Sequence, residues 1–126
     1  GYRMSQTFKV VGSLKFPLGE DELRLPSPSD PGFALSCGQL SHQILNFDAP
    51  VTDSVVGLGT MATGGAKGIY LQSIIGSFSY KFNNDTDAKP MTVQGYTLIV
   101  NPVQGWLTAL KITTAAAAKV RMIAFG

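Results

Sequence analysis

The 126-residue chain has little of what most chemical sites are built from. It contains one cysteine, Cys37, one histidine, His42, and eight carboxylates. A lone cysteine cannot form an intramolecular disulfide, and one cysteine with one histidine is too few for the ligand sets of zinc sites. The composition therefore excludes a disulfide scaffold, and we expect no metal ion and no other cofactor.

Charge is also scarce. Charged residues make up 14% of the chain, against about 25% in ordinary soluble domains. The ten Lys and Arg residues are scattered and the net charge is only +2, whereas nucleic-acid binding rewards clustered cations that neutralise several phosphates. We therefore expect no nucleic-acid partner. Low charge often accompanies surface that is buried against other subunits, which favours a homo-oligomer.

Long apolar runs and helical patterns are missing as well. No apolar run approaches the ~18 residues of a membrane span, and the start of the sequence lacks the apolar core of a signal peptide. We therefore expect no membrane partner. No segment keeps a 3.6-residue period over three turns, and the four alanines at 115–118 are too few to nucleate a helix.

The chain contains instead a series of short segments of alternating polarity. The clearest is 77–82, where Phe78, Tyr80 and Phe82 fall on one face. Strands that recur every roughly ten residues with turns between them are typical of sandwiches and barrels. The sequence predicts an all-β fold, a single-domain antiparallel β-sandwich that is jelly-roll-like, over residues 1–126. The expected strands are 6–11, 13–18, 39–48, 51–58, 68–75, 77–82, 91–100, 106–112 and 119–125.

Residues 19–38 differ in character and predict a proline-rich loop or arm. Three prolines lie within residues 25–32, a density that excludes helix and central strand. A loop of about twenty residues is long for a compact domain and is often ordered by a neighbour. The segment also holds four large apolar residues, which we expect to form an interface with another subunit: Leu23, Leu25, Phe33 and Leu35.

Two stretches resemble ligand motifs at first sight. The glycine-rich stretch 57–68 matches neither the P-loop nor the dinucleotide-binding pattern, so we expect a flexible loop. Asn83, Asp85 and Asp87 alternate as in a calcium loop, but Ala88 and Gln94 stand where glycine and glutamate are needed. A polar turn is expected there, with weak surface calcium binding as the alternative.

No catalytic arrangement is evident. Ser41 and His42 are neighbours on an expected strand and so point to opposite faces, which prevents a nucleophile–base pair. The carboxylates at 20–22 have no second member elsewhere to act with. We therefore expect that the protein is not an enzyme. Tyr96 and Trp106 are candidates for stacking on a sugar ring, although the position of Trp106 between a turn and a strand favours a plug at the end of the sandwich.

The second half of the chain shows a familiar succession. An amphipathic strand ends at Ser73–Ile75 and is followed by a polar turn with Asn83-Asn84. Then come Gly95–Pro102, the Gln-Gly-Trp-Leu step at 104–107, and a terminal apolar strand, Lys119–Phe125. This succession over residues 69–126 resembles the C-terminal part of small structural proteins of tailed bacteriophages.

The resemblance implies a β-sandwich or jelly-roll domain that acts as a trimer in the virion. The implied role is a capsid decoration (cement) protein, which stabilises the shell by burying surface across subunit joints. Its partners would be the major capsid protein or other virion proteins, and it would assemble in the host cytoplasm. The alternative is a receptor- or carbohydrate-binding module of a phage fibre or a cell surface.

Overall fold

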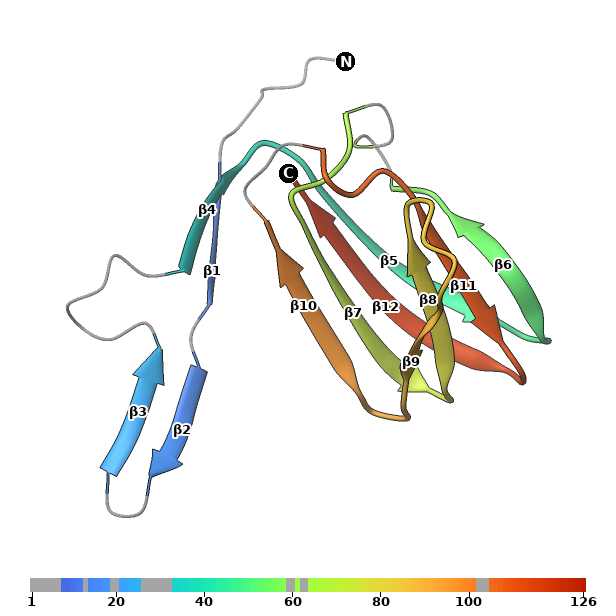
Figure 1. The fold of residues 1–126 in the computed structure, drawn as a ribbon, viewed down its shortest axis with the longest axis horizontal. Coiled ribbons are helices and arrows are strands. Elements are labelled where there is room, and N and C mark those ends of the chain that lie inside the picture. Colours follow the sequence, from blue (N-terminus) through green and yellow to red (C-terminus); the bar gives the residue numbers. More distant parts are fainter. Residues whose placement is uncertain are drawn as a thin grey trace. The chain divides into compact units, whose positions relative to one another are not determined.

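The computed structural model describes residues 8–12, 14–18, 21–25, 33–58, 61, 64–101 and 105–126, and side chains from Cys37 onward. Within these ranges the regular elements are twelve β-strands, all paired antiparallel (Figure 1). The prediction of an all-β fold is therefore confirmed. No helix in this described part is long and apolar enough to cross a membrane.

The chain divides into two compact units, residues 1–38 and 39–126. The first unit contains two separate strand pairs. Strand β1 (Phe8–Gly12) pairs with β4 (Phe33–Cys37), and β2 (Leu14–Leu18) pairs with β3 (Asp21–Leu25). The sandwich lies entirely in the second unit. That residues 1–38 belong to the same domain as the sandwich stays a prediction.

Two four-stranded sheets make up the sandwich. Sheet I has the strand order β10-β7-β12-β5, and sheet II has the order β6-β11-β8-β9. The strands are β5 (Leu40–Phe47), β6 (Val51–Val56), β7 (Gly68–Ile75), β8 (Phe78–Phe82), β9 (Lys89–Met91), β10 (Tyr96–Val100), β11 (Leu110–Thr114) and β12 (Ala118–Phe125).

The pairing follows a jelly-roll order. The first strand of the sandwich pairs with the last (β5–β12), the second with the second last (β6–β11), and so on through β7–β10 and β8–β9. These nested pairs alternate between sheet I and sheet II, as in one long hairpin that is rolled up. The predicted antiparallel β-sandwich is therefore confirmed, and its nested strand order resembles that of an eight-stranded jelly roll.

The core lies between the two sheets and follows from the period-2 alternation. In β8, β11 and β12 buried and half-buried positions alternate along the strand. Each fully buried aliphatic side chain contributes about 1.5–3 kcal/mol through removal from water. The largest of these core residues are Met61, Ile69, Leu71, Leu107, Leu110, Ile112, Val120 and Met122.

Two of the expected strands, 91–100 and 106–112, have other boundaries in the structure. The predicted strand 91–100 is two strands, β9 in sheet II and β10 in sheet I, because a turn at 92–95 carries the chain between sheets. Gln94 has a positive φ of 63° there, which a continuous strand does not allow. The predicted strand 106–112 begins only at Leu110, since Trp106 and Leu107 belong to the preceding loop and bridge.

The proline-rich segment 19–38 is also less of a loop than expected. Strand β3 precedes the prolines and strand β4 follows them. The prolines themselves, at 26–31, lie outside the described residues. Pro17 stands in β2, which pairs with β3 alone, and this agrees with the expectation that a strand containing proline lies at a sheet edge.

One matched pair of substitutions tests the assignment of the core. Val120 is fully buried in β12 and Val55 is exposed on β6. We expect Val120→Ala to lower the free energy of unfolding by about 1.5–3 kcal/mol, from lost burial and the cavity left behind, and Val55→Ala to change it by less than about 0.5 kcal/mol. Urea denaturation of both variants measures this, and equal losses would contradict the described core.

Candidate assembly surface

The outer face of sheet I is unusually apolar. Register places Leu98 of β10, Tyr70 of β7, Ile123 of β12 and His42 of β5 in one row across the sheet. The rows on either side are Val100, Gly68, Phe125 and Leu40, and Tyr96, Gln72, Arg121 and Ile44. Only Arg121 among these twelve positions carries a permanent charge. We call these twelve positions the apolar face.

Several large side chains of the apolar face are open to solvent. Of the eight exposed large hydrophobic residues among those described, five lie on it: Leu40 at 55%, Ile44 at 40%, Tyr96 at 68%, Leu98 at 53% and Val100 at 44%. An outer sheet face that contacts only water normally carries polar residues. A patch of this kind is typical of a surface that binds a partner.

Two polar side chains of this face are paired with each other. Arg121 lies with its Nη1 2.8 Å from Nε2 of His42 on the neighbouring strand. Because the guanidinium can only donate, Nε2 of the imidazole is the acceptor in this contact. The result is a cationic group among mostly apolar positions, and Lys119 adds a second cation in the next row of the same outer surface.

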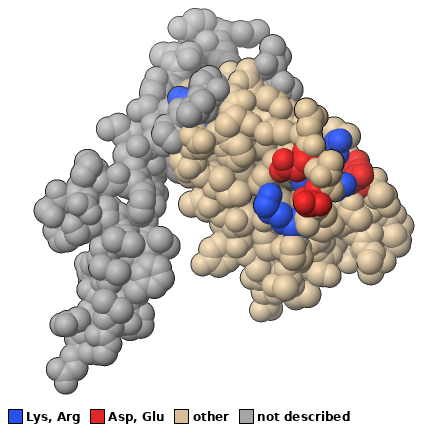
Figure 2. All heavy atoms as spheres, in the orientation of Figure 1, with Lys and Arg blue, Asp and Glu red and all other residues tan. Residues whose placement is uncertain are grey.

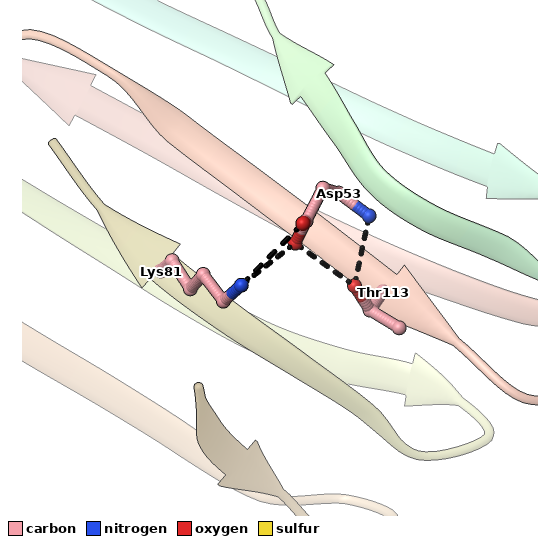
Figure 3. Close-up of polar contacts among 3 residues, drawn as sticks. All are labelled: Asp53, Lys81 and Thr113. Carbon is pink, nitrogen blue, oxygen red and sulfur yellow. Dashed lines mark hydrogen bonds and ion pairs between the residues drawn. The ribbon is translucent and has the colours of Figure 1, made fainter. Parts of the chain in front are cut away.

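The outer face of sheet II has the opposite character. Asp53 contacts Lys81 at 3.2 Å, and its backbone N–H donates to the Thr113 hydroxyl at 2.9 Å (Figure 3). Asp53 adopts a positive φ of 48° beside the register shift between β6 and β11, an arrangement typical of a β-bulge. Figure 2 shows basic and acidic side chains gathered over this part of the sandwich. The outer face of sheet II therefore has the charged side chains expected of a surface that stays exposed to water.

The four predicted interface residues of 19–38 lie in strands and not in a loop. In the β2–β3 pair, Leu23 is opposite Phe16 and Leu25 is opposite Leu14. In the β1–β4 pair, Phe33 is opposite Gly12 and Leu35 is opposite Val10. Antiparallel partners share a face, so each pair has one face whose positions are mostly apolar. That these residues form an interface stays a prediction.

The two predicted stacking residues lie apart. Tyr96 stands on the apolar face with its ring centroid 6.1 Å from that of Tyr70. Trp106 is half-buried before β11, packs edge-on against Phe82 at 5.8 Å, and donates its indole N–H to the Lys67 carbonyl. Trp106 therefore packs against the core cluster, as a plug would, and only Tyr96 offers an open aromatic face.

An open groove runs between the edge strands β5 and β6, with a volume of about 320 Å³. Gln43 Nε2 crosses it to donate to the Gly57 carbonyl at 2.8 Å. Ile44 lines the groove and also belongs to the apolar face. The residues that line it are Gln43 to Phe47 and Ser54 to Gly57, and none of them is titratable, so the groove offers no acid or base for catalysis.

The calcium alternative finds no support in the turn after β8. The Asn83 side-chain oxygen accepts from the backbone N–H groups of Thr108 at 2.7 Å and Ala109 at 3.3 Å. Asp85 faces Lys89 at 3.8 Å. Among the residues whose side chains are described, no three His, Cys, Asp or Glu lie close enough together to hold a metal ion. Asn83 thus holds residues 108 and 109 in place through its side chain, which we call the Asn83 clamp, and the segment is a polar turn.

Sequence reasoning missed the apolar face, although a signal was present. In β10 the residues Tyr96, Leu98 and Val100 point outward while Ile99 packs against the core. A strand with large apolar residues on both faces is typical of a sheet covered on both sides. The terminal strand β12, with Ile123 outward and Met122 inward, carries the same signal.

Comparisons with known proteins give little to add to this geometry. No family model and no curated protein matches the chain. Among solved structures, the chain is similar to hydroxypropylphosphonic acid epoxidase from S. wedmorenis, with 14% identity and a TM-score of 0.46, over 73% of this chain and 50% of that one. The chain thus spans about half the length of the epoxidase chain. A likeness this distant decides neither activity nor ligand.

The Asn83 clamp yields a stability prediction. Asn83 also donates from Nδ2 to the Trp106 carbonyl at 2.7 Å and adopts a positive φ of 56°. We expect Asn83→Ala to cost about 1–3 kcal/mol, because it leaves backbone donors unpaired, and to loosen Trp106. The neighbouring exposed Asn84 provides the control, since Asn84→Ala should cost less than about 0.5 kcal/mol. Urea unfolding followed by Trp106 fluorescence measures both, and similar values would contradict the clamp.

Proposed function

We propose that this chain is a non-enzymatic virion structural protein, a capsid decoration protein that stabilises the shell through subunit contacts and forms a homotrimer. The observation that carries the proposal is the apolar face of sheet I. A face of this composition is suited to permanent burial against protein. The resemblance of residues 69–126 to small structural proteins of tailed bacteriophages is the reason for proposing a virion as the assembly.

The exposed apolar area is large enough to matter for association. Full burial of a Val, Leu or Ile side chain removes roughly 60–120 Å² of surface from water, the area that corresponds to its burial energy at about 25 cal/mol per Å². Full burial of a tyrosine side chain removes about 150–250 Å². Weighted by their exposed fractions, the five exposed side chains leave on the order of 300 Å² of apolar surface. This reaches the range of the largest patches on monomers, which are often functional.

The fold alone does not decide between assembly and recognition. Jelly rolls are built into viral capsid proteins, lectins and cupins alike. What favours assembly is the contrast between the two outer faces, since one is apolar and the other carries the Asp53–Lys81 pair. A module that only bound a small ligand would need a local site and not a whole apolar sheet.

Self-association is the first property to test. We expect the purified protein to have a concentration-independent trimeric mass by light scattering behind a sizing column. Leu98→Lys should shift it toward monomer because a cation enters the buried face. Val55→Lys, at an exposed apolar residue outside this face, should leave the trimer intact. A wild-type monomer at all concentrations, or equal effects of both variants, would count against the proposed use of this face.

The decoration role itself needs a particle. Heads of the virus that encodes the chain, stripped of surface proteins, should bind the purified protein at a fixed ratio to the capsid subunit and should then withstand higher temperature before releasing DNA. Failure to bind at saturating concentration would reject a decoration role, even if the protein were a trimer.

The alternative function, a receptor- or carbohydrate-binding module, rests on the exposed ring of Tyr96, which lies beside the half-buried Tyr70. Aromatic rings exposed to solvent can stack on sugar faces. Under this alternative a glycan array would show binding that Tyr96→Ala removes, while Leu98→Ala on the same strand would retain it. Binding of that kind by a monomeric protein would favour recognition over assembly.

A further inference from the structure

We propose that the apolar face of sheet I binds the β2–β3 pair of a second copy of this chain. Each subunit would then give its β2–β3 pair to the next subunit, and this exchange would close the oligomer. The inference rests on the proposed assembly function and names the partner of the same face. Two observations carry it: the register of the β2–β3 pair and the placement of charge.

The β2–β3 pair needs a surface to bind. It is an isolated two-stranded sheet, and such a pair is marginally stable in water unless one face packs against something. Register places five large apolar residues on one of its faces: Leu14, Phe16, Leu18, Leu23 and Leu25. The opposite face carries Lys15, Pro17, Glu22 and Arg24. The pair is therefore amphipathic, with one face that requires a cover.

The charges of the two surfaces are complementary. Among its twelve positions the apolar face has one permanent charge, that of Arg121, and Lys119 lies outside them in the next row of the same outer surface. The apolar side of the β2–β3 pair has one charge as well, at Asp21, opposite Leu18 in the register. Two apolar surfaces with a single cation and a single carboxylate can bury both charges as a pair. The β1–β4 pair offers no carboxylate on its apolar side, at positions 8, 10, 12, 33, 35 and 37, which makes it the weaker candidate.

Charge argues against the simplest alternative, in which two copies of the apolar face pack on each other. Self-pairing would place Arg121 against a like surface whose twelve positions include no carboxylate. In an exchange, each subunit contributes twice, once through its face and once through its β2–β3 pair. Such head-to-tail contacts close into a ring when the rotation between successive subunits allows it, and a trimer is one such ring.

Charge reversal in the full-length protein tests the pairing. We expect Arg121→Glu and Asp21→Arg each to weaken trimer association at least tenfold, because each places like charges together. The double variant should recover most of the association, since the pair is restored with opposite signs. Lys111→Glu, on the outer face of sheet II, is the control and should have no effect. Sedimentation equilibrium over a concentration series measures all four.

Disulfide trapping gives the geometry independently. One chain carries Leu23→Cys and a differently tagged, co-expressed chain carries Leu98→Cys. Oxidation should link the two tags, whereas Leu98→Cys alone should not link to itself. Lys81→Cys in place of Leu98→Cys serves as the control for random collision, and the wild type controls for Cys37.

The outcomes separate this inference from the proposed function. If Arg121→Glu dissociates the trimer and Asp21→Arg does not, or if Leu98→Cys links to itself, the face is an interface with another occupant and the exchange is wrong. If a chain carrying both cysteines links only within itself, the β2–β3 pair is bound by its own sandwich, and the exchange is again wrong. If the wild type is monomeric and does not bind heads, the assembly function fails.

Discussion

The pairing of β12 with two neighbours is the constraint on which the rest of the sandwich depends. This terminal strand pairs with β5 over its whole length and with β7 on its other side. Its inward residues Val120, Met122 and Ala124 are fully buried. Because β5 opens the sandwich and β12 ends it, this pairing joins the ends of a segment of almost ninety residues. Once it forms, the nested partners β6–β11, β7–β10 and β8–β9 lie within reach of each other.

The same pairing creates the surface to which we assign the function. Since successive residues of a strand point to opposite faces, burial of Val120 and Met122 places Arg121 and Ile123 outward. The neighbouring strands then bring Tyr70, Leu98 and other apolar residues alongside them. The interior of the sandwich and its apolar face thus follow from one register. A shift of one residue would exchange them.

Much of the sandwich could be predicted from alternation and turn residues, as the segment 77–82 shows. What could not be predicted depends on contacts far apart in sequence. The division of 91–100 into β9 and β10 follows from the turn at Gln94, and a positive φ at a glutamine has no sequence signature. The sequence of β3 and β4 predicts a loop because prolines lie close to both strands. Their strand conformation comes from pairing with β2 and β1, which no local pattern indicates. The place of Trp106 depends on its contact with Phe82, which lies 24 positions earlier in the sequence.

The apolar face as a whole could not be predicted, for a similar reason. Leu23, Leu25, Phe33 and Leu35 stand out in the sequence because apolar residues are costly in a proline-rich loop, and that they form an interface stays a prediction. The residues of sheet I, by contrast, each belonged to an ordinary strand. Which of them point outward is decided by register, and their sum becomes visible only when β10, β7, β12 and β5 are placed side by side.

An exposed apolar sheet raises a problem of specificity, and Arg121 offers a physical answer. Covering a guanidinium with a purely apolar surface removes its hydration without replacement, which costs several kcal/mol. The imidazole of His42 accepts one hydrogen bond from Arg121 at 2.8 Å, but the charge itself stays uncompensated. Random apolar contacts are therefore penalised at this face, whereas a partner that supplies one carboxylate is not. A single buried charge can thus select the partner in a surface whose remaining contacts are largely nonspecific.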